Sequence, residues 1–191
     1  MYKTIAKIAK HIACVQEAMM LVIDELRNRA LVHDASKFGE DELKGYLRFE
    51  EMPEGLKYGS PEYQEAMAKV MEGTDCFKLH SIRHDHHPEY YDCPEQGVDL
   101  GMMGVFPLME MVSDWAGAHK SYGNKGGWRE SVEHNIEKHN FSDNQKWVIR
   151  QMADFFSRKI PELRDELNTT ADPNGSEKPQ LTPTSPRHPT L

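Results

Sequence analysis

Apolar residues recur along this chain at the spacing of helices. Over residues 3–31 they return every three or four positions, as on one face of an amphipathic helix. These residues are Ile5, Ile8, Ile12, Val15, Met19, Val22 and Leu26. His11 falls between Ile8 and Val15 inside this apolar stripe, which is an unusual place for an imidazole. The pattern predicts one long N-terminal helix.

The rest of the chain shows the same spacing in shorter segments. We expect helices at about 39–51, 61–72, 74–87, 104–121, 128–139 and 143–167. Ser60 and Ser142 are suited to cap two of them, and Pro161 is expected to kink or end the last. Two prolines and two glycines indicate a loop at 88–101. Because no segment alternates like a strand, the expected class is all-α, as a compact helical bundle.

The C-terminal segment has a different composition. Residues 168–191 are rich in Pro, Ser, Thr and Asn and poor in apolar side chains. Such a segment buries too little surface to offset the entropy lost on ordering, so it is expected to be a disordered tail. A chain of 191 residues has the length of one domain, which we assign to residues 1–167.

Charge and cysteine usage narrow the function classes. The formal net charge is −8, so a general attraction to nucleic acid or to an anionic membrane is not expected. No stretch approaches the roughly 18 apolar residues of a membrane span. The three cysteines form no C-x-x-C pair and no secretory signal is visible, which favours a cytoplasmic protein with free thiols. The sequence is compatible with a homo-oligomer as well as with a monomer.

The residues with the clearest chemistry are scattered: His11, the pair His33-Asp34, and Asp114. Adjacent His and Asp at a helix end can offer two kinds of ligand to one ion. An imidazole from the preceding helix and a carboxylate from a later one would complete a mixed nitrogen and oxygen shell, which suits Mn, Fe, Co, Ni or Zn. Asp114 lies on the most apolar segment, where a carboxylate is costly unless it is paired or bound.

A second candidate cluster is the run from His80 to Glu89, which holds four of the ten histidines. On a continuous helix, His80, His84 and His87 would share one face, while His86 would point elsewhere. Four histidines within eight residues are expected of a second metal site or of a surface that binds phosphate.

Ordinary structural roles stay open for each of these residues. His11 can be a core-edge histidine bonded to the backbone, and His33-Asp34 can be a helix end followed by a turn. The histidines at 80–87 can form a solvated face, and Asp114 can pair with an arginine. Lys37 can equally be a solvated side chain.

The ordered set of these motifs resembles the HD-domain superfamily of metal-dependent phosphohydrolases. More narrowly, it is similar to small bacterial and phage proteins of the DUF5662 type. The matching segments cover about residues 5–160, and they are HIACVQEAMM, RALVHDASKFGEDEL, HSIRHDHHPEYY and LMEMVSDWAGA. The resemblance implies an HD-like helical domain.

The resemblance also implies a ligand set. His11, His33, Asp34 and Asp114 would bind one metal ion. In two-metal members further histidines join, which here would be His80 with His86 or His87. The expected cofactor is one or two divalent ions, drawn from Mn, Fe, Co, Ni, Zn or Mg.

The implied chemistry is metal-assisted hydrolysis of a nucleotide or another small phosphate ester. Asp34 would bridge two ions or accept the proton of the attacking water, and Glu40 would orient that water. Lys37, Arg83 and His84 would contact the phosphate. Two alternatives remain: a di-iron oxygenase on the same scaffold, and a helical binding protein without catalysis.

Overall fold

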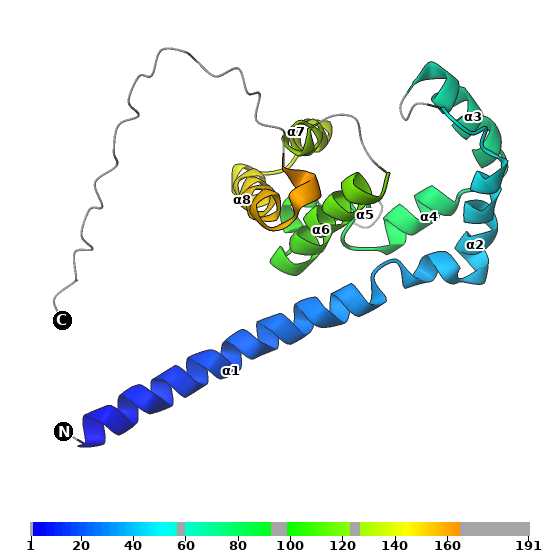
Figure 1. The fold of residues 1–191 in the computed structure, drawn as a ribbon. Helices are drawn as coiled ribbons and strands as arrows, with labels where there is room; N and C mark the ends of the chain where they lie inside the picture. The colour runs from blue at the N-terminus through cyan, green and yellow to red at the C-terminus, as the bar shows by residue number, and fades with distance from the viewer. Residues whose placement is uncertain (1, 57–59, 93–98, 123–126, 165–191) are drawn as a thin grey trace, which may run out of the picture.

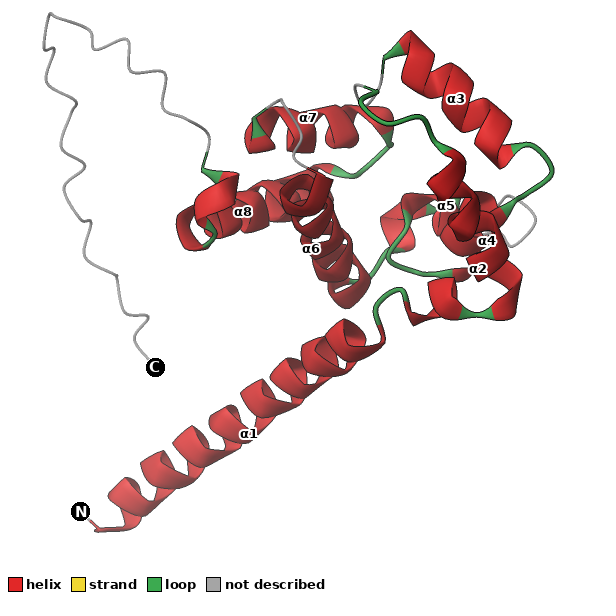
Figure 2. Cartoon of the chain, turned by 45° about the vertical axis from the view of Figure 1, so that its right-hand side comes forward, coloured by secondary structure: helices red, strands yellow, loops and turns green. Residues whose placement is uncertain are grey.

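Helices make up all the regular secondary structure in the described part of the chain (Figure 2). A computed structural model describes residues 2–56, 60–92, 99–122 and 127–164. The all-α class expected from the sequence is confirmed. The expected tail at 168–191 lies outside the described residues.

The elements follow the predicted order with shifted ends. The α-helices are α1 (Tyr2–Val32), α2 (Glu40–Leu47), α3 (Pro61–Met71), α4 (Cys76–Arg83), α5 (Pro88–Tyr91), α6 (Val105–Tyr122), α7 (Trp128–Lys138) and α8 (Asp143–Lys159). The 3-10 turns are η1 (Ala35–Phe38), η2 (Arg48–Glu51), η4 (Leu100–Met102) and η5 (Pro161–Leu163). Helix α8 ends before Pro161, as expected of a residue that cannot continue the hydrogen-bond ladder.

The hydrophobic core lies between α6, α7 and α8. Its buried side chains include Met111 and Val112 of α6 and Ile149 of α8. Trp128 at the start of α7 is also buried, and its indole N–H donates to the carbonyl of Ala153 across the core at 3.0 Å. This core fixes α6, whose other face carries acidic side chains toward the candidate site.

Helices α2 and α4 lie against each other at a close contact. A Cβ atom built on Gly45 would lie 2.5 Å from the Cβ of Cys76, well inside any normal carbon contact. Glycine at this position therefore allows the two helices to approach. The contact positions Glu42 of α2 beside His80 of α4, both of which are buried.

Helix α1 extends away from the other helices as a straight arm (Figure 1). None of its residues is buried, so the apolar stripe seen in the sequence is not covered. Its C-terminal end is tied to the rest by Arg29, whose guanidinium pairs with Asp85 at 2.9 Å and with Glu110 at 2.8 Å. No described helix has the combination of length and apolar character needed to cross a bilayer.

Candidate metal centre

The candidate centre begins where α1 stops. Asp34 has a φ of 55°, in the left-handed region that aspartate tolerates better than most residues with a Cβ. This conformation turns the chain sharply from α1 into η1, where the Lys37 N–H bonds the Asp34 carbonyl at 2.9 Å. The turn directs the Asp34 carboxylate toward His80 of α4 and His86 of the turn that follows it.

Four potential ligand atoms converge beside this turn. They are Oδ1 of Asp34 and Nε2 of His80, His86 and His87. All are buried and lie within 4.8 Å of one another, and Oδ1 of Asp34 is 3.0 Å from Nε2 of His80 and 3.4 Å from Nε2 of His86. Two imidazole nitrogens crowded onto one carboxylate oxygen, with a third imidazole nitrogen close by, form a donor set that could hold a cation.

Carboxylates contact the other ring nitrogen, Nδ1, of two of these imidazoles. Oε2 of Glu42 lies 2.9 Å from Nδ1 of His80, and Oε1 of Glu110 lies 3.3 Å from Nδ1 of His86. In metal sites, a ligating histidine typically donates its other N–H to a carboxylate, which fixes its tautomer and leaves the inward nitrogen free to bind. Both histidines therefore have the partners that ligands need.

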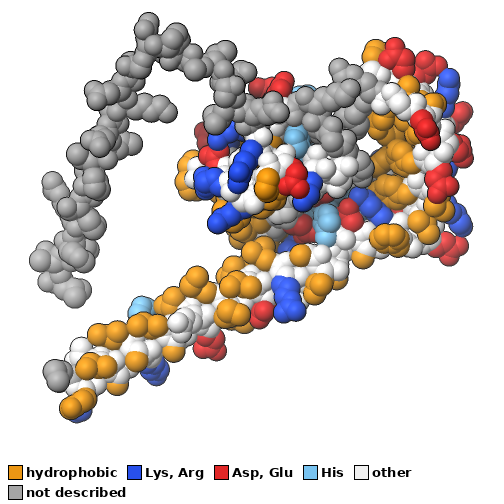
Figure 3. Space-filling model, viewed as in Figure 1, with side chains coloured by type: hydrophobic (Ala, Val, Ile, Leu, Met, Phe, Trp, Pro, Cys, Tyr) orange, Lys and Arg blue, Asp and Glu red, His pale blue; other side chains and the backbone are white. Residues whose placement is uncertain are grey.

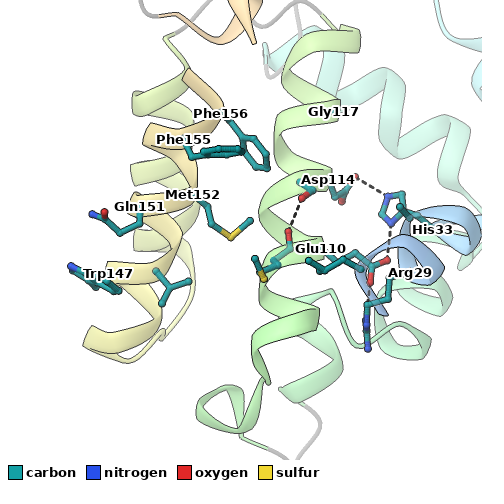
Figure 4. A pocket seen from close by; sticks show the side chains of 15 residues that line it. Arg29, His33, Glu110, Asp114, Gly117, Trp147, Gln151, Met152, Phe155 and Phe156 are labelled. Carbon is teal, nitrogen blue, oxygen red and sulfur yellow. Dashed lines mark hydrogen bonds and ion pairs between the residues drawn. The ribbon is translucent and has the colours of Figure 1, made fainter. Parts of the chain in front are cut away.

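A second group of ligand atoms adjoins the first. It consists of His33, His86 and Asp114, and Nε2 of His33 lies 3.5 Å from Oδ1 of Asp114 and from Oδ2 of Asp34. Figure 4 shows His33 facing Glu110 and Asp114, which lie one turn apart on α6. Because Oδ1 of Asp34 faces the first group and Oδ2 the second, its carboxylate lies between two possible ion positions.

The protonation states in the metal-free chain follow from these contacts. The interaction with Asp114 raises the pKa of His33 to about 9, with Glu110 adding to it against the effect of burial. Burial lowers the pKa of His87 to about 3, so this imidazole is neutral and ready to ligate. Burial would raise the pKa of Asp34, but contacts with His80, His86 and Lys37 outweigh it and hold the pKa well below its usual range.

The centre has more fixed negative than positive charge. Its carboxylates belong to Asp34, Glu42, Asp85, Glu110 and Asp114, whereas Arg29 and Lys37 are the permanent cations among the described residues beside it. Carboxylates this close repel one another unless protons or cations lie between them. One or two divalent cations would balance this charge.

Two cavities adjoin the centre. One of about 560 Å³ is lined by η1, by the turn after α4 and by Arg29, and it reaches Asp34, His84 and His86. The other, of about 710 Å³, is mainly apolar and lies between α1, α6 and α8, with His33 and Asp114 on its wall. The first opens onto the candidate ligands Asp34 and His86, and its volume is typical of small-molecule sites.

Most of the residues proposed from the sequence meet at this centre. Six of the seven proposed metal ligands come together, and they are His33, Asp34, His80, His86, His87 and Asp114. Lys37 pairs with Asp34, and His84 accepts or donates a 2.7 Å hydrogen bond with Ser36 at the edge of the centre.

His11 does not join them. It is exposed on α1, 21 positions before Val32, the last residue of that helix and the neighbour of His33, which corresponds to about 32 Å along the axis. A straight helix cannot bring both imidazoles to one ion of the same chain. The expectation for His11 is therefore corrected.

Two further assignments also need correction. The Glu40 side chain is 86% exposed and pairs with Lys44 on the outer face of α2, because the helix begins at Glu40 and points this residue outward. Arg83 pairs with Asp41 at 3.2 Å on the surface rather than reaching the centre. Neither residue is placed to contact a reacting group.

The arrangement of the histidine run also differs from the prediction. Helix α4 ends at Arg83, so His84 to His87 form a turn instead of a further helical turn. This turn directs both His86 and His87 inward, although a continuous helix would have separated them. Pro88 then starts α5, where its missing N–H costs nothing.

The sequence reasoning missed the supporting carboxylates. Glu110 precedes Asp114 by four residues, and this spacing on one helix face was a usable signal. Glu42 is the third of three consecutive acids, and only the exact start of α2 decides which of them turns inward. The Arg29 and Asp85 pair had no signal in the sequence.

Comparison with known proteins adds a family assignment. Searches of curated proteins and of solved structures each gave no match. One family model, described as a family of unknown function (DUF5662), matches residues 1–170. This match includes every residue of the candidate centre. The chain therefore belongs to the DUF5662 family.

Proposed function

We propose that this protein is a metal-dependent phosphohydrolase that acts on a nucleotide or another small phosphate ester. The observation that supports it is the convergence of four buried candidate ligand atoms, from Asp34, His80, His86 and His87, within 4.8 Å of one another. The similarity to HD-type hydrolases in the order of the motifs points to the same chemistry.

The donor set fits a divalent transition metal. Imidazole and carboxylate ligands accept Mn, Fe, Co, Ni and Zn, and the adjoining group around His33 and Asp114 offers a second position. When bound, such an ion lowers the pKa of a water ligand toward 7 and polarises a phosphoryl oxygen. We propose that Asp34 would help to hold ions at both positions, or would take up the proton of a water activated there.

The protein's own charges determine how a phosphate would approach. Glu25, Asp85 and Glu110 line the 560 Å³ cavity, and Arg29 is already engaged by all three. A phosphate would therefore be repelled by the metal-free chain and attracted only after cations are bound. Lys37, two-thirds buried beside Asp34, is placed to contact a phosphoryl oxygen when its carboxylate partner engages an ion.

Elemental analysis followed by a phosphate-release screen tests this function. The purified protein should hold one or two divalent ions per chain and release phosphate from at least one nucleotide or small ester. His80→Ala should abolish both properties, whereas His134→Ala, on the exposed face of α7, should leave them unchanged.

The same measurements distinguish the alternatives. Bound iron with an oxygen-dependent optical signal and no phosphate release would favour a di-iron oxygenase. A protein that binds no added metal and gains no thermal stability from it would be a helical binding protein, and the proposal would be wrong.

A further inference from the structure

The apolar cavity between α1, α6 and α8 adjoins the candidate centre directly. Its volume of about 710 Å³ is in the range of small-molecule sites. His33 and Asp114, which belong to the second group of candidate ligands, lie on its wall. The side chains that α8 contributes to the wall are Trp147, Val148, Gln151, Met152, Phe155 and Phe156. A molecule in this cavity therefore touches the centre and an apolar surface at the same time.

We propose that this cavity binds the organic part of the substrate, and that the substrate is a phosphate monoester of an alcohol with an aromatic or other large apolar group. Its phosphate would lie at the centre and its apolar group against α8. Water would add to phosphorus, the ester P–O bond would break, and the products would be inorganic phosphate and the alcohol, which takes up a proton. This inference rests on the proposed phosphohydrolase function and narrows its substrate class.

The two sides of the cavity differ in chemistry. In Figure 4, side chains of α8 approach α6 from one side, and His33 and Arg29 of α1 approach it from the other. The rings of α8 are not fully covered, because Trp147 is 63% exposed and Phe155 is 48% exposed. Figure 3 shows further apolar side chains on this face of the molecule. A ligand ring packed against these side chains would remove apolar surface from water, and aromatic pairs add a favourable edge or offset contact.

Helix α6 leaves room for such a ligand between these two sides. Ser113 and Gly117 lie one turn apart on this helix, and both line the cavity. The Ser113 hydroxyl donates to the carbonyl of Met109 at 2.7 Å, so it stays against its own helix. A Cβ atom built on Gly117 would meet no neighbouring atom within 4 Å. The space beside Asp114 is therefore not filled by side chains of α6.

A nucleoside matches this wall less well than an apolar group does. Away from the centre, the polar side-chain groups among the described lining residues are the Ser113 hydroxyl, the Gln151 amide and the indole N–H of Trp147. The hydroxyls of a ribose and the polar edges of a base would lose water against this wall and gain few partners. The lining therefore favours an apolar organic group.

Two esters with similar leaving groups test the proposal. Ethyl phosphate and 2-(1-naphthyl)ethyl phosphate both release a primary alcohol, so a difference in kcat/KM reports the contacts of the ring system. We expect the metal-loaded protein to favour the naphthyl ester at least about 100-fold, since about 150 Å² of buried ring surface corresponds to more than that factor. Equal kcat/KM values for the two esters would overturn the proposal.

A variant that fills the cavity tests the location. Gly117→Leu places a side chain in the open space beside α6 and should reduce the preference to less than about tenfold. Glu137→Leu adds the same side chain to the exposed face of α7 and should keep the full preference. Both positions are exposed, so helical content and metal content should equal those of the original protein. A full preference in Gly117→Leu would place the organic group elsewhere and overturn the proposal.

Binding without catalysis separates this inference from the proposed function. The alcohol 2-(1-naphthyl)ethanol carries the rings but no phosphate, and its fluorescence reports binding. Its dissociation constant should be below about 1 mM, and Gly117→Leu should raise it at least about tenfold. Binding of this alcohol without cleavage of either ester would retain the cavity as an apolar site and reject the phosphohydrolase function. Cleavage of both esters without binding of the alcohol would retain that function and overturn the assignment of the cavity.

Sedimentation equilibrium distinguishes a small ligand from a protein contact. We expect Gly117→Leu to have the same mass in solution as the original protein. A dimer that this variant alone converts to a monomer would assign the cavity to a contact between two copies and overturn the proposal.

Discussion

Asp34 combines two requirements in one side chain. Its backbone adopts a left-handed conformation that ends α1, and its carboxylate lies between the two groups of candidate ligands. Among residues with a Cβ, asparagine shares its tolerance of this conformation, since a short polar side chain can bond locally. The backbone and ligand requirements can therefore be separated by substitution.

Asp34→Asn should retain the fold and lose metal binding, because it preserves the turn and removes the negative charge. Asp34→Ala should lose metal as well and should also be less stable than Asp34→Asn by about 1 kcal/mol, since alanine is strained at a φ of 55°. Elemental analysis and urea unfolding measure the two effects. Full metal content in Asp34→Asn would show that this carboxylate is not a ligand.

Glu42 acts through another residue. Its carboxylate is fully buried against Nδ1 of His80, so Glu42→Gln should keep the packing but weaken the hold on the imidazole. We expect metal affinity to fall about 10- to 100-fold. Glu40→Gln is the matched control two residues away on the exposed face, and its affinity should equal that of the original protein. Equal losses in both variants would contradict the positioning role.

At the scale of elements, the centre depends on how closely α2 approaches α4. These helices carry Glu42 and His80, and the space between them at Gly45 has no room for a methyl group. A change that separates the helices should therefore loosen the ligand without touching it.

Gly45→Ala should destabilise the protein by about 1–3 kcal/mol and weaken metal binding, because the added Cβ overlaps Cys76 and Thr74. Gly117→Ala on α6 is the comparison, since its Cβ meets nothing within 4 Å. This second change should be neutral or stabilising by about 0.5–1 kcal/mol, the usual gain of alanine over glycine within a helix. Thermal unfolding of both variants measures the difference.

The spacing of apolar residues was sufficient to predict most of the helices, because each helix has one apolar face. In α1 that face is exposed, and in the others it packs against neighbouring helices at least in part. It failed at His84 to His87, where helical spacing predicted a shared face for His80, His84 and His87 but the chain leaves the helix after Arg83. Residues 88–91, assigned to a loop, form the short helix α5. Pro88 favours the extended conformation seen at His87, but it does not show that the helix already ends at Arg83.

At the scale of the whole molecule, the centre joins three distant parts of the chain: the end of α1, α4 with the turn after it, and α6. The sequence indicated these ligands by residue type and by motif order. It could not place His11, because a stripe of apolar residues predicts that a helix has a partner but not whether the partner lies in the same chain. The supporting carboxylates of Glu42 and Glu110 were not predicted either, because their role depends on which side of each helix faces the centre.

Because the ligands come from separate parts, a bound ion should stabilise the whole fold. A divalent ion at 100 times its dissociation constant contributes about 2.7 kcal/mol when it binds only the native state. For a chain of this size we expect Tm to rise by roughly 5–10 °C. Differential scanning fluorimetry with Mn²⁺, Co²⁺ and Zn²⁺ measures this rise. Asp34→Asn should show no rise, and an equal rise in that variant would place the ion elsewhere.

The straight arm of α1 also determines how the molecule rotates in solution. A compact chain of 191 residues would have a radius of gyration of about 16 Å, which corresponds to a diameter of roughly 42 Å, and this helix, about 46 Å long, projects beyond the other helices instead of lying across them (Figure 1). A particle of that form tumbles anisotropically, and end-over-end rotation is its slowest motion. Helical N–H bonds lie nearly parallel to the helix axis, so the amides of α1 would report that slow rotation in nuclear spin relaxation.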